Sequence, residues 1–361
     1  MLSFSIYEFN TGYNIKIQYK EDIITLDRRL VPKDQKVAVV SGSSTGIGLE
    51  TCLLFARNGI RTYATMRDLV KASSLQKIAK KEKIPLKVIE MNVDKDDSVA
   101  KAFKKISDDG KEMRIDILVN NAGFGLFGAL EDQPMEDIKK QFETNLFGAI
   151  RTIQQVLPIM RNQRSGTIVN ISSLAGYVGF PASSVYVSTK FALEGLSESL
   201  AYEIEPYGIK VILIEPGVVN TNFVENIVIP ENTQSISSSV LSSSLSPSKS
   251  TTVTSSPEID SGCITHSDNP KSNRETTKYT NVVERFLSHY YPAMSNAPGP
   301  KEVAEVVFES VERSVIFPRQ QSKNNNFFRY PVGKDAKLYA DAKRKMSDSE
   351  LRSFVAKMTL S

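Results

Sequence analysis

From Lys36 onward, short runs of apolar residues alternate with longer segments whose apolar residues recur every three or four positions. An apolar run of four to six residues is typical of a strand buried on both faces, and the longer spacing indicates an amphipathic helix. Strands and helices that alternate in this order form a parallel sheet through right-handed crossovers. The expected strands are 37–40, 61–66, 86–91, 115–119, 167–171 and 209–214, and the expected helices are 47–58, 69–81, 96–109, 135–163 and 184–205. The sequence therefore predicts an α/β fold with a doubly wound parallel sheet and helices on both faces.

Two segments depart from this alternation. Residues 1–35 alternate only weakly and end at the turn-forming run Val31-Pro32-Lys33-Asp34, so we expect an N-terminal appendage with a short strand. Within residues 235–256, 12 of 22 positions are serine and almost none can pack. This composition predicts a low-complexity, disordered insertion over residues 231–280.

Regular patterning returns after the insertion. Val282 begins a helical pattern, Pro300 stands in the first turn of another helix, and Phe327–Tyr330 reads as a last strand before a helix at Lys334–Lys345. We therefore expect residues 281–361 to complete the domain that residues 36–230 begin, as its lid helix, last strand and tail.

Composition excludes several classes of protein. The 45 Lys and Arg against 41 Asp and Glu leave a net charge of +4, too small and too scattered to predict a nucleic-acid partner. Cys52 and Cys263 lie far apart without a CxxC motif, and with two histidines they predict neither disulfides nor a metal site. The absence of an 18-residue apolar run and of a secretion signal at the N-terminus predicts a cytoplasmic protein without a membrane span.

The loop Ser41-Gly-Ser-Ser-Thr-Gly-Ile-Gly48 lies between the first expected strand of the sheet and the helix that follows it. At this position glycines let backbone N–H groups and a helix N-terminus approach a phosphate group. Since the same spacing also occurs in ordinary turns, the prediction of a phosphate site depends on the flanking strand and helix.

Polar residues follow two further strands at their carboxyl ends, where doubly wound sheets bind ligands. Asn120-Asn-Ala-Gly123 comes after the run 115–119, and Ser172 and Ser173 come after the run 167–171. Taken by themselves, the asparagines are better explained by an Asx turn. A serine hydroxyl at this edge can hydrogen-bond the carbonyl group of a substrate.

Tyr186 and Lys190 are four residues apart in a segment expected to be helical, so their side chains share one face. A phenol, with a pKa of about 10, exchanges protons poorly at neutral pH unless a nearby cation stabilises the phenolate. Lys190 can supply that cation, which would make Tyr186 a general acid and base. An ordinary exposed Tyr–Lys pair is the alternative for this pair taken alone.

Taken together, these motifs resemble the short-chain dehydrogenase/reductase family, which has the Rossmann fold. The resemblance covers residues 36–225 closely and 281–345 loosely. It is carried by six motifs in order: SGSSTGIG, NNAG at 120–123, Asn145 in ETNLFG, Ser173, Tyr186-x-x-x-Lys190, and Pro216-Gly-Val-Val-Asn-Thr221. The spacing of Gly42, Gly46 and Gly48 differs from the G-x-x-G-x-x-G loop usual in the sugar epimerases that share the Tyr–Lys pair.

The resemblance implies an oxidoreductase that interconverts a carbonyl compound and an alcohol with a nicotinamide cofactor. In this role Tyr186 transfers the proton, Lys190 lowers its pKa and binds the nicotinamide ribose, Ser173 positions the carbonyl, and Asn145 holds a water molecule. Ser172 is the alternative to Ser173. The implied cofactor contacts are Gly42, Ser44, Thr45, Gly46, Ile47, Gly48, Arg67, Asn92, Val93, Asn120, Ala122, Gly123, Tyr186, Lys190, Pro216, Gly217, Val219 and Thr221.

Cofactor choice is read at the end of the second strand of the sheet. Arg67 follows this strand, and with Thr45 it would attract the 2′-phosphate of NADP(H), whereas an acidic residue there would bind the 2′-hydroxyl of NAD(H). We expect NADP(H), with NAD(H) as the alternative because Asp68 is adjacent. Asn92 stands where the family usually has aspartate, and its amide oxygen can still accept a hydrogen bond from adenine.

The segments around Tyr63-Ala-Thr-Met and Lys190-Phe-Ala-Leu-Glu-Gly-Leu resemble the steroid and retinol dehydrogenase branch. This resemblance suggests a bulky apolar substrate, held by Phe124, Leu126, Phe180 and Phe223. The helices 135–163 and 184–205 are candidates for a dimer or tetramer interface. A non-catalytic dinucleotide-binding protein, acting as a redox sensor or scaffold, is the competing hypothesis.

Overall fold

The structure is a computed structural model that describes residues 36–109, 114–223, 227–229, 278–316 and 327–360, and the backbone of three N-terminal strands. These strands pair in antiparallel fashion, and they are β1 (Phe4–Phe9), β2 (Gly12–Tyr19) and β3 (Asp22–Asp27). The prediction of one short strand is therefore wrong. The sequence alternates visibly only around β2, and β1 and β3 are recognised by their pairing with it.

Seven strands form the central sheet in the order β10-β9-β8-β7-β4-β5-β6, and every neighbouring pair is parallel. They are β4 (Val37–Val40), β5 (Arg61–Met66), β6 (Leu86–Glu90), β7 (Ile117–Asn120), β8 (Gly166–Ile171), β9 (Ile209–Pro216) and β10 (Phe327–Val332). The predicted doubly wound parallel sheet is confirmed. The strand order reverses between β4 and β7, which places the expected ligand site at the carboxyl ends of these strands.

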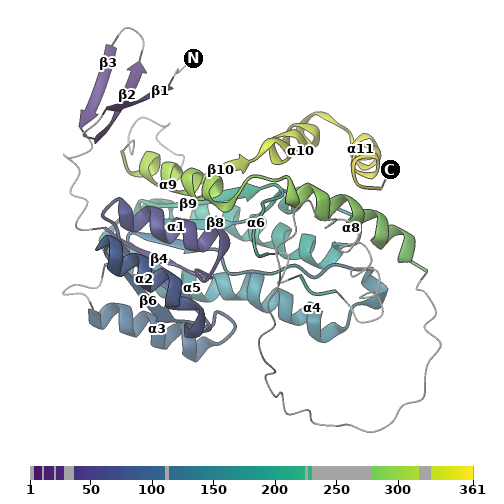
Figure 1. Cartoon of the computed structure of the whole chain (residues 1–361), viewed down its shortest axis with the longest axis horizontal. Helices are drawn as coiled ribbons and strands as arrows, with labels where there is room; N and C mark the ends of the chain where they lie inside the picture. The colour runs from purple at the N-terminus through teal and green to yellow at the C-terminus, as the bar shows by residue number, and fades with distance from the viewer. Residues whose placement is uncertain are drawn as a thin grey trace, which may run out of the picture.

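Helices cover both faces of the sheet (Figure 1). One face is covered by α1 (Gly46–Arg57), α2 (Ser73–Glu82) and α9 (Pro300–Ile316), and the other by α3 (Asp96–Asp109), α5 (Gly148–Gln163) and α6 (Ser184–Ile204). The other helices are α4 (Met135–Phe142), α8 (Thr280–Ser295), α10 (Lys334–Lys345) and α11 (Asp348–Leu360). Short 3-10 turns are η3 (Leu69–Ala72), η4 (Leu130–Asp132), η6 (Leu174–Gly176) and η7 (Glu205–Tyr207).

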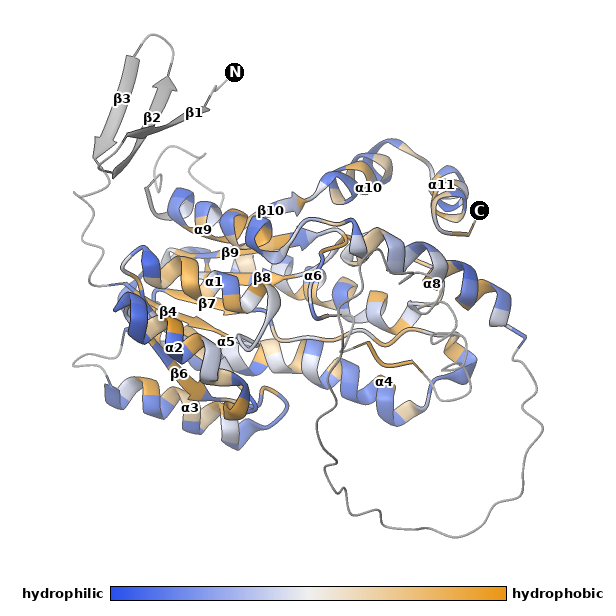
Figure 2. Cartoon of the chain, viewed as in Figure 1, coloured by the Kyte–Doolittle hydropathy of each residue, from blue (hydrophilic) through white to orange (hydrophobic). Residues whose placement is uncertain are grey.

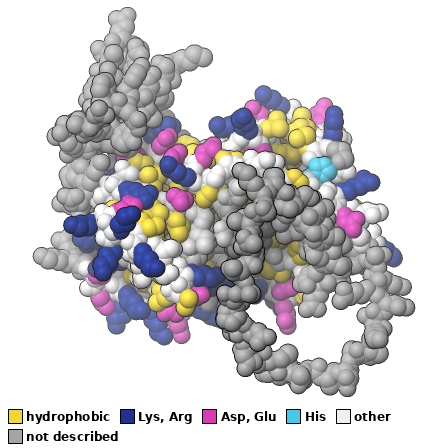
Figure 3. Space-filling view, viewed as in Figure 1, with side chains coloured by type: hydrophobic (Ala, Val, Ile, Leu, Met, Phe, Trp, Pro, Cys, Tyr) yellow, Lys and Arg dark blue, Asp and Glu magenta, His cyan; other side chains and the backbone are white. Residues whose placement is uncertain are grey.

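The strands in the middle of the sheet are largely apolar because both of their faces are buried, whereas the edge strands β6 and β10 are only partly buried. In β4, Val37 and Val39 pack into the core beneath α3, α5 and α6, while Ala38 and Val40 pack into the core beneath α1, α2 and α9. Figure 2 shows the hydrophobic colour on the strands and the hydrophilic colour on the outer sides of the helices. On the surface shown in Figure 3, Lys and Arg side chains are interspersed with Asp and Glu.

The helix predicted over 135–163 is interrupted. Between α4 and α5 the backbone forms a π-helical segment, η5 (Glu143–Phe147), which contains the expected site residue Asn145. The segment contains neither Pro nor Gly, so the sequence carries no signal that would mark a break in the helix there. Such π segments occur frequently at functional sites.

The predicted insertion lies almost entirely outside the described residues, which resume at residue 278 with α8 beginning at Thr280. Elements on both sides of it contribute to one fold, since α9 packs against α1 and β10 pairs with β9. Figure 1 shows α8, α10 and α11 at one end of the molecule, away from α2 and α3. Within the described ranges, none of the helices has the length and apolar composition to cross a membrane.

Candidate active site

The loop between β4 and α1 brings its backbone close to the loop after β7. Gly42 adopts a left-handed conformation (φ +66°), and a Cβ there would lie 2.7 Å from the Cα of Ala122. A Cβ on Gly48 would lie 2.5 Å from the Nδ2 atom of Asn121. Both glycines are therefore required by close approach of the chain. The loop leads into the N-terminus of α1, where Thr45 is the N-cap and its hydroxyl does not bond the amides of its own helix.

The two asparagines that follow β7 have different surroundings. Asn121 donates from Nδ2 to the carbonyl oxygens of Ser41 (3.1 Å) and Gly42 (2.9 Å), so it ties the glycine loop to β7. Asn120 is buried and its side chain bonds Asn170 (2.8 Å) and Thr152 (2.6 Å) inside the fold. The prediction that Asn120 contacts the cofactor is thus not supported by its position. Asn121 is the member of the pair that faces the groove.

A groove of about 360 Å³ lies beside the glycine loop. Most of the expected cofactor contacts line it, namely Gly42, Ser44, Thr45, Gly46, Ile47, Arg67, Asn92, Val93, Ala122, Gly123 and Thr221. A helix N-terminus and a loop shaped by glycines on one wall are the features that bind a pyrophosphate. The residues present therefore fit a dinucleotide. Asn92 uses its Oδ1 atom to accept a bond from the Asp94 amide at 3.1 Å, which leaves one lone pair for adenine.

Arg67 and Asp68 differ in what they contact at the end of β5. The Asp68 carboxylate accepts a bond from the Val70 amide (2.9 Å) and caps the 3-10 turn η3. Arg67 is exposed and lines the groove together with Thr45. The positive side chain, rather than the acidic one, is therefore available to a ligand at this corner.

Tyr186 and Lys190 lie one turn apart on α6, and both line a second cavity of about 810 Å³. Lys190 is buried and donates from Nζ to the Ile171 carbonyl oxygen at 2.9 Å, with Nζ 5.7 Å from the centre of the Tyr186 ring. Ser173 starts the turn η6, accepts a bond from the Ala175 amide (3.1 Å) and interacts with Tyr186. Ser172 instead lies beside Glu194. The structure therefore places Ser173, and not Ser172, with the Tyr–Lys pair.

Burial dominates the protonation of this pair. It raises the pKa of Tyr186 to about 12, against which the hydrogen bond with Ser173 acts. It also lowers the pKa of Lys190 to about 8, while the charge of Glu194 acts to raise it. The expected lowering of the Tyr186 pKa by Lys190 is therefore not seen in the chain by itself, where burial and the hydrogen bond with Ser173 set the pKa. At neutral pH the phenol is protonated and poised to donate.

Asn145 lies in the π segment, and both N–H hydrogens of its side chain are donated in hydrogen bonds. Its Nδ2 atom donates to the Phe124 carbonyl oxygen (3.0 Å) and to Thr189 Oγ1 (3.1 Å), and its Oδ1 atom accepts from the Phe124 amide (3.0 Å). Asn145 thus fixes the loop after β7 against α6, close to Lys190. Because both N–H hydrogens of the Asn145 side chain are already donated, a water molecule beside it cannot accept a hydrogen bond from this amide. Such a water molecule would have to donate to an acceptor atom instead.

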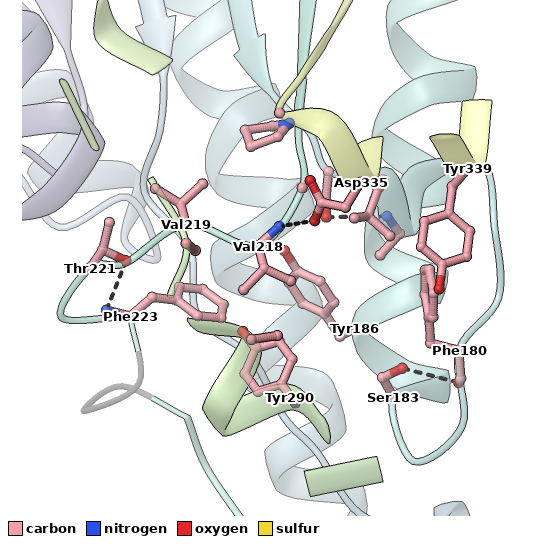
Figure 4. Close-up of a pocket in the computed structure, with 18 of the residues that line it drawn as sticks. Phe180, Ser183, Tyr186, Val218, Val219, Thr221, Phe223, Tyr290, Asp335 and Tyr339 are labelled. Atoms are coloured by element: carbon pink, nitrogen blue, oxygen red, sulfur yellow. Dashed lines mark hydrogen bonds between the residues drawn. The ribbon is translucent and has the colours of Figure 1, made fainter. Parts of the chain in front are cut away.

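The second cavity is bounded by aromatic side chains and by the loop that follows β9 (Figure 4). Phe223 and Tyr290 of α8 both lie beside the Tyr186 ring, and the ring centroids of Phe223 and Tyr186 are 6.0 Å apart. Phe124 and Phe180 also line the cavity, as expected for substrate contacts, but Leu126 is buried in a β-bridge to Val228. Four expected cofactor contacts in the loop after β9 also line this second cavity: Pro216, Gly217, Val219 and Thr221. Ile47, Asn121 and Thr221 line both the groove and the cavity, so the two adjoin.

Comparison with known proteins gives a match of residues 36–232 to the family model for short chain dehydrogenases. The chain belongs to the short-chain dehydrogenase/reductase family. It is 34% identical over 307 residues to the uncharacterized oxidoreductase YusZ of Bacillus subtilis (strain 168), a match covering 84% of this chain and 91% of that protein. This family membership makes it an NAD(P)-dependent oxidoreductase with a small-molecule substrate.

Two relatives place the dehydrogenase in the steroid and retinol branch of the family. Human retinol dehydrogenase 8 is 41% identical over 192 residues, covering 52% of this chain and 60% of that protein. Estradiol 17-beta-dehydrogenase 1 of Rattus norvegicus is 38% identical over 200 residues, covering 54% of this chain and 57% of that protein. This chain therefore spans less than two thirds of the length of either relative.

A solved structure also resembles the chain. The gluconate 5-dehydrogenase of Burkholderia cenocepacia J2315, in complex with NADP and tartrate, superposes with a TM-score of 0.50 at 27% identity and covers 53% of this chain and 74% of that one. The complex supports a nicotinamide dinucleotide as the cofactor of this dehydrogenase.

Two site residues are not apparent from the sequence motifs. Asn121 belongs to a recognised motif, but the sequence does not show which asparagine of the pair faces the groove. Asp335 of α10 lines the cavity and reaches the loop after β9 from 117 positions away along the chain. Neighbouring residues in the sequence carry no signal for a contact of that range.

Proposed function

We propose that this dehydrogenase interconverts a carbonyl compound and an alcohol with NADP(H), using Tyr186 as the general acid and base. The observation that carries the proposal is the convergence of Ser173, Tyr186 and Lys190 on a cavity that adjoins the dinucleotide groove. A bound nicotinamide supplies or takes up the hydride. The chain itself then has to orient the carbonyl group and supply one proton.

The protonation state of each group suits reduction. Ser173 holds the carbonyl oxygen beside the Tyr186 hydroxyl, and Tyr186 gives its proton to that oxygen as negative charge develops there. Lys190, charged below a pKa of about 8, stabilises the phenolate that remains. Asn145 keeps the loop after β7 in place beside Lys190 through its bonds to Phe124 and Thr189.

The preference for NADP(H) over NAD(H) rests on the corner formed by Arg67 and Thr45. A guanidinium group and a free hydroxyl suit a 2′-phosphate, whereas the Asp68 carboxylate, which would repel it, is turned to its own 3-10 turn. The substrate that we propose is bulky and apolar. An aromatic-lined cavity of about 810 Å³ supports this class, as do the names of the retinol and estradiol dehydrogenases that resemble the chain.

Two coarser expectations accompany this proposal. We infer that residues 36–230 and 281–361 form one domain, with 231–280 as an insertion, because α9 and β10 pack against elements of the first part. A homo-oligomer built on α5 and α6 is supported by exposed apolar side chains there, Phe191 (44% exposed) and Tyr202 (75% exposed). The cytoplasmic location remains a prediction from the sequence.

The test follows the loss of NADPH absorbance with a panel of ketones and aldehydes, including apolar ring compounds. Tyr186→Phe should lower kcat by about 10²- to 10⁴-fold, because the general acid is lost. The Kd for NADPH, measured separately by calorimetry, should change little. Tyr207→Phe in η7, directly after the same helix, is the matched control, since this ring lies outside the cavity. Wild-type turnover in Tyr186→Phe would refute the assignment, and NADPH binding without turnover on any carbonyl would favour the non-catalytic alternative.

A further inference from the structure

Asp335 lies in the first turn of α10 and bonds a loop of the active site. Its Oδ2 atom accepts a hydrogen bond from the Val218 amide at 2.6 Å (Figure 4). An acidic residue in a first turn commonly interacts with the amides of its own helix. Here the carboxylate instead accepts its bond from the loop after β9, which holds the expected nicotinamide contacts.

The backbone around this carboxylate is shaped to admit it. A Cβ on Gly217 would collide with the carboxylate, and a Cβ on Gly333 would lie 2.8 Å from Oδ1. Gly333 also has a φ of +100°, which only glycine adopts without strain. Both glycines therefore leave room for the same side chain, one from each of the two segments that it joins.

The helix that carries Asp335 is fixed at three points. β10 pairs with β9, and the Gly217 amide donates to the Val332 carbonyl oxygen at 2.9 Å just before the turn into α10. The Tyr177 hydroxyl donates to the Ala336 carbonyl oxygen at 2.8 Å, which ties α10 to the turn that follows Ser173. The ring of Tyr339 packs against Phe180 with centroids 5.2 Å apart. Asp335 thus presents its acceptor from a rigid position.

The loop held in this way bridges the two cavities. Val219 faces the larger cavity, and Thr221 lines both the cavity and the dinucleotide groove. The side chain of Thr221 lies 3.5 Å from the position of a Cβ on Gly46, so the loop closes against the glycine loop. A small change in the orientation of the Val218 peptide would therefore displace Val219 and Thr221 together.

We propose that Asp335 is a positioning residue of the cofactor site, whose carboxylate fixes the Gly217–Thr221 backbone for the nicotinamide end of the dinucleotide. This inference rests on the function proposed above. It also assigns α10, which follows the insertion in the sequence, to the cofactor site. Asp335 touches the loop and not the reacting atoms, so its removal should weaken dinucleotide binding more than it slows the chemical step.

The experiment compares Asp335→Ala, Asp335→Asn and a control, Asp341→Ala. Asp341 lies on the same helix and pairs at the surface with Arg344. Two readouts are used, the Kd for NADPH by calorimetry and hydrogen exchange of the peptide that covers residues 216–223 without cofactor. Steady-state kinetics then separate the KM for NADPH from kcat.

Asp335→Ala should raise the Kd and the KM for NADPH about tenfold, because the Val218 amide loses a charged partner. It should speed exchange in 216–223 and change kcat less than KM. Asp335→Asn keeps an acceptor oxygen in place and should restore most of the affinity and protection, and Asp341→Ala should match the wild type. If Asp335→Ala does not fold, Asp335→Ser takes its place, because it also removes the carboxylate that accepts from the Val218 amide; the same tenfold rise in the Kd for NADPH is expected, and wild-type affinity would overturn the proposal.

Wild-type affinity and exchange in Asp335→Ala would overturn the proposal. So would a fall in kcat with the KM for NADPH unchanged, because the effect would then be on the chemistry. If the wild-type protein binds neither NADPH nor NADH, the proposed function fails, while the exchange measurement still tests whether Asp335 orders the loop.

Discussion

Replacement of Arg329 by methionine should destabilise the protein strongly at alkaline pH and weakly at acidic pH. Arg329 on β10 contacts three carboxylates: Glu194 at 3.1 Å, Glu198 at 3.0 Å and Glu215 at 3.4 Å. The side chains of Glu194 and Glu215 are only 8% and 4% exposed, respectively. Glu194 is also one turn beyond Lys190 on α6. Arg329 is therefore the countercharge of a buried acidic cluster behind the Tyr–Lys pair.

The pKa values give the magnitude and the sign. Burial raises the pKa of Glu215 from 4.5 to about 8, and Arg329 acts to lower it. Burial likewise raises the pKa of Glu194. A carboxyl group with a raised pKa binds its proton more tightly in the folded chain, so the free energy of unfolding falls as pH rises from about 4.5 to about 8. At about 1.4 kcal/mol per pKa unit, ionising Glu215 alone costs roughly 4 to 5 kcal/mol across this range.

Without Arg329, the free-energy cost of ionising the buried carboxyl groups increases, so the protein is destabilised most where these groups are charged. Removing one partner of a fully buried ion pair typically costs about 3 to 5 kcal/mol. Because the Arg329 side chain is 41% exposed, solvent screens these pairs, and we expect roughly 2 to 3 kcal/mol at pH 8.5. At pH 5.5 Glu215 holds its proton, so we expect Arg329→Met to cost about 1 kcal/mol, from altered packing and hydrogen bonds. The difference between the two pH values should thus be about 1 to 2 kcal/mol.

Urea unfolding measures this difference. It is followed by far-UV circular dichroism, because the chain has no tryptophan whose fluorescence could be used. Arg57→Met is the matched control, because Arg57 pairs with Glu82 at 2.7 Å in an exposed position. It should cost less than about 1 kcal/mol at either pH. Equal destabilisation by Arg329→Met at pH 5.5 and 8.5 would refute the reasoning, since the loss would then be one of packing and not of countercharge.

Three further predictions concern the site itself. The rate of carbonyl reduction should fall as pH rises through about 8, because Lys190 loses its proton there. Glu194 acts to raise the Lys190 pKa, so in a pH-rate profile Glu194→Gln should move this fall in rate to lower pH. Arg67→Ala should raise the KM for NADPH by about 10- to 100-fold and leave that for NADH unchanged, and equal effects on both would argue against a 2′-phosphate contact. Gly42→Ala should lower stability by about 1 to 3 kcal/mol and weaken dinucleotide binding, because its Cβ would lie 2.7 Å from the Ala122 backbone at a φ of +66°; thermal unfolding with and without NADPH measures both.

The middle of the central sheet was predictable because burial on both faces favours strands that are largely apolar. The runs at β4 and β5 coincide with the observed strands. By contrast, α11 has its buried residues on a narrow stripe, Leu351, Val355 and Thr359, within an otherwise polar tail. Such a helix depends on the surface that receives it, here α8, and its own sequence indicates it weakly.

The candidate site likewise contains residues that the sequence predicts and residues that it does not. Ser173, Tyr186 and Lys190 were predictable because each belongs to a local motif of fixed spacing, and the structure brings them to one cavity. The role of Asp335 depends on a contact 117 residues away, and that of Arg329 on three glutamates from two other elements. Contacts of this range arise only once β10 has paired with β9, so local spacing does not reveal them.

The late position of α9 in the chain has a consequence for synthesis. This helix covers the same face as α1, with Phe308 packed against Phe55 at 6.0 Å, yet 259 residues separate the ends of the two helices, Arg57 and Ile316. At about 5 to 20 residues per second, the ribosome needs roughly 13 to 50 s to make that length. During this time the side of α1 that later packs against α9 has no partner helix, so the nascent chain should depend on chaperones that shield it until α9 has been made.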